Sequence, residues 1–494
     1  MENNSIKKNI IYSAILTTSN YVIQLVTFPY LSRILGVENI GIVNFVDGVV
    51  NYFIMISMLG LNILGIREVA KASNDISKRN SIFSVLFSIN LCFTIIVTLI
   101  YISLIYLVPQ FYEKRDLLLL GIFKLLFNLF LIEWFYKGIE NFKYITARTL
   151  VLRIIYLFSL FIFVKNRNDI YVYYIITVLL VVFNAVVNWI YSQRFVLYSW
   201  AHVRTFKLYI KPYIYLGFYL ILTSAYTTFN VIYLGFVSSE REVGYYVTAL
   251  KIYIIILGLF TSLTNVMMPR MSALLSNGSV IEFRKKINAT YWLFFSVSIP
   301  LVFAIIPLSD AIIAIIAGNG YEGAVLPMQL IVPLILIVGI AQVFVSQILI
   351  PLKRDAVILK IAVVGAVVGL SFNLTLVSNL ASVGTAITLL CSELSVTIFL
   401  FCYMFRHRLL FIPINSIKLN VFYSIPYWII VVLLKGILTD NWQILLLSFV
   451  LCCMYFLLSQ LFFIKNPWIV SFVQNYFCVV ILGLKNVNLN NLSL

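Results

Sequence analysis

Charged residues are scarce in this chain. Of its 494 residues only 11% are charged, whereas 62% are hydrophobic, and the mean hydropathy is +1.02. Soluble domains contain about 25% charged residues, so the sequence lacks the polar surface that a water-soluble protein of this length needs. The deficit excludes an ordinary soluble enzyme, a disordered chain and a fibrous protein. It indicates a protein whose main solvent is lipid.

Metal-binding side chains are also few. The only two histidines, His202 and His407, lie in basic segments, and the six cysteines form no C-x-x-C pair. We interpret the cysteines as small apolar residues and predict no disulfide, no metal site and no cofactor. The sequence contains no G-x-x-x-x-G-K-[ST] motif either, which argues against ATP hydrolysis by a P-loop.

The hydrophobic residues are gathered in long runs. A membrane-spanning helix needs about 20 mostly apolar residues, and about 14 runs meet this criterion. We therefore predict an all-α, polytopic membrane protein. Its approximate spans are 10–31, 40–64, 82–108, 117–136, 149–164, 170–191, 212–238, 244–266, 291–316, 325–350, 357–378, 383–405, 419–436 and 443–464. Residues 468–484 are apolar but short for a span, and we predict an interfacial helix there.

The distribution of basic residues predicts the orientation. The net charge is +17, and most Lys and Arg residues fall in alternate loops, beginning with the segment that contains Lys7 and Lys8. Only seven of the 35 basic residues fall in the other loops: Arg33, Lys114, Arg115, Lys165, Arg167, Arg241 and Lys435. Cytoplasmic loops collect Lys and Arg, so we predict a cytoplasmic N-terminus and an even number of spans. The positive charge then needs no nucleic acid partner to explain it.

A weak internal repeat predicts two lobes. Gly41 and Gly244 begin the second and eighth spans and are 203 residues apart, and Arg67 and Arg270 follow these spans at the same offset. A repeat of six spans preserves orientation, so it predicts two parallel lobes about an axis along the membrane normal. We place one six-helix lobe at residues 1–211 and the other at 212–418. Two extra spans and the interfacial helix occupy 419–494.

Ionisable residues within spans are costly, and they usually face a bundle interior or a water-filled cavity. Asp47, Lys124 and Lys251 each lie about seven residues past the outer end of a span, roughly 10 Å deep. One interpretation is a polar cavity in which Lys124 and Lys251 bind an anion, with Asn230 as a polar companion. The alternative is a structural Asp47–Lys124 pair and a Lys251 that snorkels outward.

Three further charged positions invite a prediction. Glu393 lies near the middle of the twelfth span and is a candidate for proton coupling, with a structural hydrogen bond as the alternative. Arg33, at the outer end of the first span, belongs either to the rim of the cavity or to an interfacial anchor. Arg153 lies near the inner end of its span, where snorkelling explains it.

Several segments, in their order and spacing, resemble one known family. Residues 28–36 (FPYLSRILG), followed by Gly41, look like the first-helix signature of Wzx-type polysaccharide flippases. This family belongs to the multidrug/oligosaccharidyl-lipid/polysaccharide exporter superfamily. Residues 134–140 (WFYKGIE) resemble the family's segment after the fourth helix, and residues 243–252 resemble its eighth helix. The likeness covers most of the chain through about residue 405.

The resemblance implies a flippase for an undecaprenyl-diphosphate-linked oligosaccharide, in the cytoplasmic membrane of a bacterium, that works by alternating access without covalent chemistry. Cationic cavity residues would meet the anionic head group, and by position these are Lys124, Lys251 and Arg33. Expected partners are membrane lipids, a glycan polymerase and the chain-length machinery. The alternatives are a drug/cation antiporter of the same superfamily, which acidic cavity residues would favour, and a membrane glycan polymerase, which the short outer loops argue against.

Overall fold

The structure, a computed structural model, describes residues 2–72, 75–199, 203–276, 278–466 and 470. The regular elements of these described residues are all helices, as expected for an all-α membrane protein. They are α1 (Glu2–Met58), α2 (Leu61–Lys71), α3 (Ile76–Leu107), α4 (Pro109–Tyr112), α5 (Arg115–Asn128), α6 (Glu133–Gly138), α7 (Phe142–Phe163), α8 (Ile170–Ser192), α9 (Val203–Ser224), α10 (Phe229–Val237), α11 (Glu240–Ser276), α12 (Val280–Ile316), η1 (Glu322–Ala324), α13 (Val325–Ile331), α14 (Leu334–Val343), η2 (Phe344–Leu349), α15 (Asp355–Phe372), η3 (Asn373–Val377), α16 (Ser378–Arg406), α17 (Ile414–Phe422), α18 (Ile425–Ile437), α19 (Asn441–Leu458) and η4 (Ser459–Phe463).

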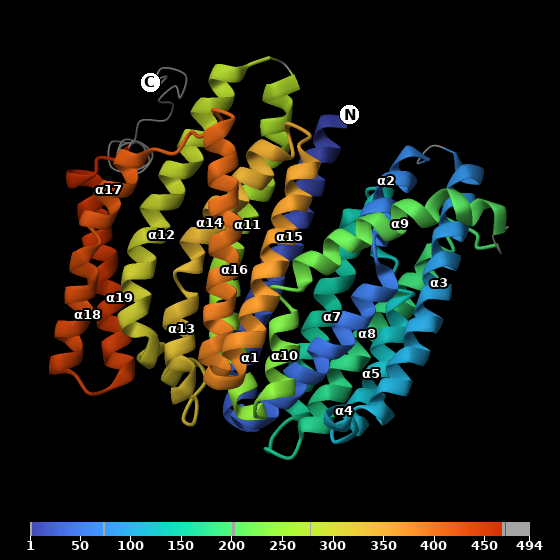
Figure 1. Cartoon of the computed structure of the whole chain (residues 1–494), viewed down its shortest axis with the longest axis horizontal. Helices are drawn as coiled ribbons and strands as arrows, with labels where there is room; N and C mark the ends of the chain where they lie inside the picture. The colour runs from blue at the N-terminus through green and yellow to red at the C-terminus, as the bar shows by residue number, and fades with distance from the viewer. Residues whose placement is uncertain (1, 73–74, 200–202, 277, 467–469, 471–494) are drawn as a thin grey trace.

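The polytopic architecture is confirmed, but the count of fourteen spans is not. Among the described residues, 11 helices are long and apolar enough to cross a membrane, or 12 if the bent pair α9 and α10 forms one span. Two of these helical stretches each contain two predicted spans, and each has a non-helical residue between them. These residues are Gly36 in α1 and Ala381 in α16. Figure 1 shows α1 descending from the end marked N and rising again towards α2.

The helices form two groups that lie side by side. Figure 1 shows α2–α8 and the second half of α1 on one side and α10–α16 on the other, while the first half of α1 overlaps the second set in this view. We call α1–α8 the N-terminal group and α10–α16 the C-terminal group. Helix α9 runs across from the first group to α10, to which it is bent by 53°. Tyr213 of α9, just past the predicted lobe boundary, is buried in the N-terminal group, where its hydroxyl donates a hydrogen bond to the Ser57 carbonyl (2.8 Å).

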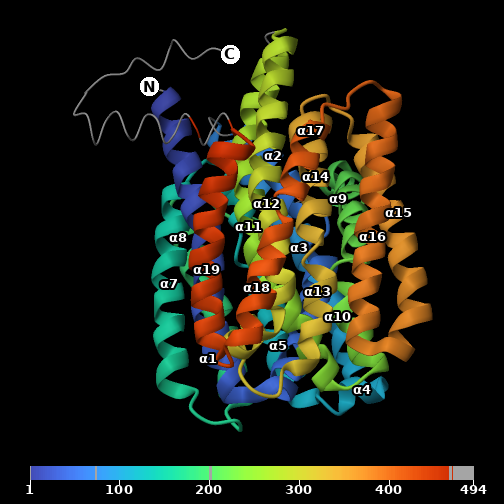
Figure 2. The same ribbon diagram turned by 90° about the vertical axis from the view of Figure 1, so that its left-hand side faces the viewer.

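The two ends of the bundle are easily told apart. We call the end with the N-terminus and α2 the N-terminal face and the end with α4 the opposite face (Figure 1). Helices α11 and α12 have 37 residues each, about 55 Å at 1.5 Å per residue, whereas the hydrocarbon core is about 30 Å thick. They extend past the predicted spans 244–266 and 291–316 and form a hairpin that projects from the N-terminal face (Figure 2).

The three helices α17–α19 pack on α12 at the edge of the C-terminal group (Figure 2). Buried polar side chains link this C-terminal segment internally and to α12. The Gln460 side-chain amide donates to the Asn420 Oδ1 (2.9 Å), and the Asn466 amide donates to the Ser296 hydroxyl (2.7 Å). Hydrogen bonds of this kind stabilise helix contacts in lipid, where burial of apolar surface contributes little. The predicted interfacial helix, 468–484, lies outside the described residues except for residue 470.

In each group one carboxylate at the opposite face binds a neighbouring segment of the same group. In the N-terminal group, the Glu38 carboxylate pairs with Arg167, which lies in the turn between α7 and α8. In the C-terminal group, the Glu242 carboxylate accepts hydrogen bonds from the backbone amide (3.1 Å) and the hydroxyl of Ser382, at the break in α16. Each acid lies a few residues before a repeat glycine, Gly41 or Gly244, although Glu38 and Glu242 are not at equivalent positions of the repeat.

Candidate functional site

Asp47 and Lys124 form an ion pair within the N-terminal group. Asp47 lies on the second half of α1 and Lys124 on α5, and the Lys124 Nζ is 2.6 Å from the Asp47 Oδ1. Only 8% of the Lys124 side chain is exposed, whereas 30% of the Asp47 side chain is. The Lys124 ammonium also lies 5.5 Å from the centre of the Tyr174 ring. The Asp47–Lys124 ion pair named in the structural alternative is thus present, as expected for a buried ammonium that needs its counterion.

Lys251 lies on α11 in the C-terminal group and has a different environment. It is half-buried, and its Nζ lies 4.7 Å from the centre of the Phe28 ring of α1. No carboxylate of the described residues lies within ion-pair distance of this ammonium, although Asp47 is close enough to act on it electrostatically. The two lysines thus approach α1 from the two groups, and Asp47 on α1 is the acidic residue near both.

An apolar cavity lies beside the Lys251 contact. It has a volume of about 190 Å³ and is lined by α1, α11 and α12, among them Phe28, Ile252 and Ile256. Its lining joins the two groups of helices, because α1 belongs to one group and α11 and α12 to the other. A charged side chain and an apolar crevice are therefore adjacent at this boundary.

Asn230 and Glu393 belong to a second polar region, inside the C-terminal group. The Asn230 amide donates to the Tyr226 carbonyl (3.0 Å) and its Oδ1 accepts from the Asn373 amide (2.9 Å), with Asn230 fully buried. Glu393 on α16 is half-buried and interacts electrostatically with Tyr226 and Tyr253. It forms no hydrogen bond or ion pair with other described residues. In the described part of the chain, no hydrogen bond or ion pair joins Asn230 or Glu393 to the two lysines.

Arg33 lies at the opposite face, away from the other predicted residues. Its side chain is exposed, and its guanidinium donates to the Ile315 carbonyl at the end of α12. It therefore bridges the two groups of helices at their surface. As for metals, the described residues contain no group of three or more His, Cys, Asp or Glu that could hold an ion.

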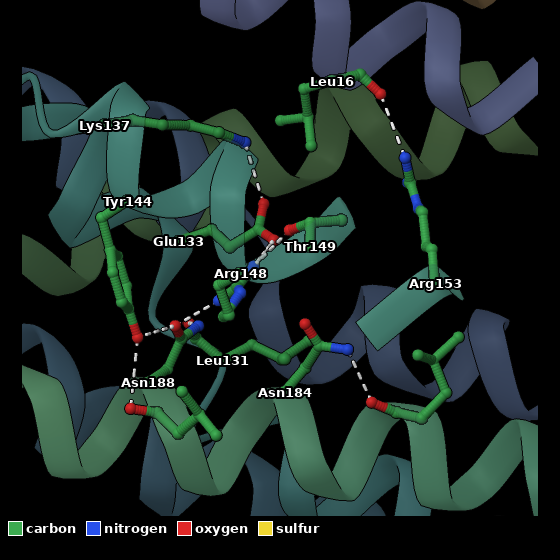
Figure 3. A network of polar contacts seen from close by, with 12 residues as sticks. Leu16, Leu131, Glu133, Lys137, Tyr144, Arg148, Thr149, Arg153, Asn184 and Asn188 are labelled. Carbon is green, nitrogen blue, oxygen red and sulfur yellow. Dashed lines mark hydrogen bonds and ion pairs between the residues drawn. The ribbon is translucent and has the colours of Figure 1, made fainter. Parts of the chain in front are cut away.

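Sequence reasoning missed a polar network at the N-terminal face (Figure 3). Arg148 on α7, with 4% of its side chain exposed, pairs with Glu133 at the start of α6 (3.1 Å) and donates to the Asn188 Oδ1 on α8. The Asn188 amide donates in turn to the Leu131 carbonyl, and the Tyr136 hydroxyl donates to the Asn188 carbonyl (2.5 Å). These bonds tie α6, α7 and α8 together and position the segment WFYKGIE.

Arg153, one helical turn beyond this network, does not simply snorkel. Its guanidinium donates to the Leu16 carbonyl (3.1 Å; Figure 3). It also donates to the Ser19 hydroxyl (2.5 Å) and the Asn20 Oδ1 (3.2 Å), which lie on α1 as Leu16 does. The sequence of α8 contained a signal for this polar network, because Asn184 and Asn188 are four residues apart in an otherwise apolar helix. Polar residues at that spacing share one helix face, which therefore meets protein rather than lipid.

The fold and these intramembrane charges define a polytopic transporter-type membrane protein. The structure is similar to that of the lipid II flippase MurJ in an inward closed conformation, with a TM-score of 0.76 and 13% identity, over 92% of this chain and 99% of that one. It is also similar to an inward-facing multidrug resistance MATE family transporter of the MOP superfamily, with a TM-score of 0.55 and 13% identity, over 79% of this chain and 98% of that one. At such identities the likeness shows the fold alone.

The model of the polysaccharide biosynthesis protein family matches residues 6–275, and the chain belongs to this family. Two relatives, from Escherichia coli (strain K12) and Shigella dysenteriae, bear the name "Putative O-antigen transporter". The first is 29% identical over 82% of this chain and 98% of its own length. The second is 27% identical over 80% of this chain and 98% of its own length. The named relatives and flippases are transporters rather than enzymes.

The Glu133–Arg148 pair predicts a stability effect. Removing one partner of a buried ion pair costs about 3–5 kcal/mol. We expect a smaller loss for Glu133→Gln, because 34% of the Glu133 side chain is exposed and Asn188 still binds Arg148. The measurement is the midpoint of thermal unfolding in detergent.

The matched control is Glu113→Gln, which removes an exposed carboxylate that is 3.9 Å from Lys114 and should change stability little. The double variant Glu133→Gln/Arg148→Gln should recover part of the loss, because no unpaired charge stays buried. Equal midpoints for the two single variants would contradict a role of the network in stability.

Proposed function

We propose that this protein is a flippase that translocates an undecaprenyl-diphosphate-linked oligosaccharide repeat unit from the inner to the outer face of the bacterial cytoplasmic membrane by alternating access. The family membership, the relatives' names and the likeness to the MurJ fold support the class of substrate. Lys251 carries the proposal at the level of residues, because it is an intramembrane cation at the boundary of the two groups without a carboxylate at ion-pair distance.

The site is proposed to use Lys124 and Lys251 for the diphosphate. Intramembrane charges mark substrate pathways in most transporters. Asp47 neutralises Lys124 in this structure, so an incoming diphosphate would compete with Asp47 for that lysine and meet Lys251 directly. Arg33 is proposed to line the rim of the cavity, and Asn230 to be its polar companion. Neither contacts the lysines in this conformation, so both would act in another state.

Alternating access requires two bodies, and we propose that the lobes 1–211 and 212–418 are those bodies. The contacts of Glu38 and Glu242, each within its own group, support this division. The segment 419–494 would accompany the second lobe, because α17–α19 pack on α12. We place the N-terminal face in the cytoplasm, since Arg67, Lys71 and Lys137 lie there and the positive-inside rule favours that orientation.

The apolar cavity beside Lys251 supports a binding mode in which the lipid tail and the charged head group of the substrate lie in different environments. The polyprenyl tail would stay in lipid or in this crevice, while the charged head group crosses between the lobes. Moving one elementary charge through 100 mV is worth about 2.3 kcal/mol, and the cytoplasm is negative. The membrane potential therefore favours export of the anionic head group. A glycan polymerase and the chain-length machinery would receive the product on the outer face.

A drug/cation antiporter is the second candidate. Asp47 and Glu393 are intramembrane acids of the kind that bind cations, and the fold is also similar to that of a MATE transporter. The pairing of Asp47 with Lys124 weakens this candidate, because the carboxylate is already neutralised. Glu393 stays as our candidate for proton coupling within the flippase.

The first prediction concerns the substrate. In a strain that lacks this protein, complete lipid-linked repeat units should accumulate on the inner face of the membrane, because they are made there and not translocated. Mass spectrometry of the lipid-linked glycans, combined with a test of which face they occupy, measures this. Normal lipid-linked glycans would favour the antiporter, and units stalled on the outer face would favour a polymerase.

The second prediction concerns Lys251. Lys251→Ala should abolish glycan export, because the diphosphate loses its unpaired cation, and Lys251→Arg should restore part of it. Surface glycan is measured in cells with equal amounts of each variant in the membrane. Lys360→Ala is the matched control, because Lys360 is an exposed lysine of α15. Unchanged export by Lys251→Ala would remove this residue from the site.

The third prediction concerns Glu393. If this carboxyl group carries the coupled proton, Glu393→Gln should remove the dependence of export on external pH while leaving the protein folded. Export is measured over a pH range in cells whose membrane potential is held constant. The same pH dependence in Glu393→Gln and the parent would leave Glu393 with a structural role only.

A further inference from the structure

The two groups of helices touch most closely at the opposite face, where α1 crosses α11. A Cβ atom on Gly41 would lie 1.8 Å from the Glu240 carbonyl oxygen and 3.0 Å from the Gly244 nitrogen. A Cβ atom on Gly244 would lie 2.3 Å from the Val37 carbonyl oxygen. The two backbones are therefore in direct contact, and only glycine fits at either position. Gly41 and Gly244 are also the equivalent positions of the repeat.

An ion pair crosses the same boundary. The Lys114 Nζ, from the turn between α4 and α5, lies 2.8 Å from the Glu240 Oε1 at the start of α11. Only 11% of the Lys114 side chain is exposed, and its ammonium lies 5.6 Å from the centre of the Phe45 ring. Glu240 thus contributes twice: its carboxylate binds Lys114 and its carbonyl touches Gly41.

A second set of contacts joins the groups before the break in α1. The Ser32 hydroxyl donates to the Ile316 carbonyl (3.3 Å), and the Tyr321 hydroxyl donates to the Ser32 carbonyl (3.2 Å). The neighbouring Arg33 guanidinium donates to the Ile315 carbonyl. These bonds attach the first half of α1 to the end of α12 and the turn that follows it.

The break in α1 lies between the two sets of contacts. Gly36 has a φ of 78°, a conformation that costs side-chain residues more than glycine. The backbone can rotate there without disturbing the helix on either side. Glycines of this kind are suited to absorb the change in direction when a domain moves.

We propose that these contacts form the closed outer gate of the cavity, with the Gly41–Gly244 contact as its seal, the Lys114–Glu240 pair as its latch and Gly36 as its hinge. The inference rests on the proposed alternating access and names the residues that close one side. In lipid, helices associate through close packing of small residues and polar bonds rather than through hydrophobic burial. One methyl group at the seal therefore separates the lobes, and one reversed charge weakens the latch.

Thiol labelling tests the gate without turnover. The reporter is Val37→Cys in a chain whose six native cysteines are replaced, because Val37 is 7% exposed and its carbonyl touches Gly244. A membrane-impermeant maleimide is added outside intact cells. Gly41→Ala and Gly244→Ala should each raise the labelling rate of the reporter several-fold. Gly436→Ala should not, because nothing lies within 4 Å of an added Cβ there.

Charge reversal at the Lys114–Glu240 latch gives a second test, in which the double variant is the control. Lys114→Glu places like charges together and should also raise the labelling rate, and Lys114→Glu/Glu240→Lys should return it towards the parent value. This recovery separates a gate from a protein that has merely misfolded. Labelling that stays at the parent rate in both glycine variants and in Lys114→Glu would overturn the proposal.

The outcomes for the gate and for the flippase are distinguishable. If the reporter responds as expected but lipid-linked glycans do not accumulate in the deletion strain, the gate stands and the proposed substrate is wrong. If the glycans accumulate and the reporter does not respond, the flippase stands and the gate is wrong.

Discussion

The packing of α1 against α11 is the constraint on which the rest of the structure depends. Helix α1 belongs to the N-terminal group, yet its longest contact is with a helix of the other group. Phe28 meets Lys251, Gly41 meets Gly244, and Asp47 meets Lys124 from its own group. Any change in the angle between the groups must therefore move the surroundings of both lysines. Helix α1 therefore contributes residues both to the candidate site and to the contact between the two groups.

Charge in a low-dielectric solvent explains how the ionisable residues are arranged. An unpaired buried ion costs several kcal/mol, so Lys124 lies against Asp47 and Arg148 against Glu133. Arg153 meets the same need without an acid, because it donates to three oxygens of α1. Lys251 departs from this pattern and has an aromatic face in place of a carboxylate, a contact worth about 0.5–2 kcal/mol. Of these four cationic side chains, Lys251 is therefore the one whose charge the described residues compensate least, which is why we propose it for the anion.

Much of the fold was predictable because the membrane imposes it. Each predicted span from 10–31 to 443–464 falls on helical structure, since lipid leaves the backbone few alternatives. The ends were less predictable: α11 and α12 continue through basic segments that hydropathy excludes. The gaps between the predicted spans at 31–40 and 378–383 contain the breaks at Gly36 and Ala381, but they did not predict that the helices α1 and α16 continue across them. The structure supports the Asp47–Lys124 pair, one of two open interpretations, whereas the roles of Lys251, Arg33, Asn230 and Glu393 stay predictions.

The Glu133–Arg148 network was not predictable from loop positions. The predicted orientation explains why a positively charged residue stands at position 148. It does not explain why the Arg148 side chain is buried, which depends on the packing of α6, α7 and α8. The Gly41–Gly244 contact shows the opposite case. The two residues drew attention as a weak repeat, and the structure places them against each other. A repeat position near an axis that relates two lobes would lie close to its own copy, so this contact is what the predicted two-lobe arrangement leads us to expect.

In the proposed site, Asp47 pairs with Lys124 and is near enough to Lys251 to act on it electrostatically, which bears on how the flippase would release its cargo. Two unpaired lysines would hold a diphosphate in the low-dielectric interior at a large electrostatic gain, and the cargo would then leave slowly. Asp47 already occupies one lysine, so binding replaces an existing ion pair rather than forming a new one, and the net gain is smaller. When the head group departs from the proposed site, the carboxylate would return to Lys124 and no bare charge would be left behind. An acid in the proposed anion site would thus lower affinity and allow the empty carrier to return.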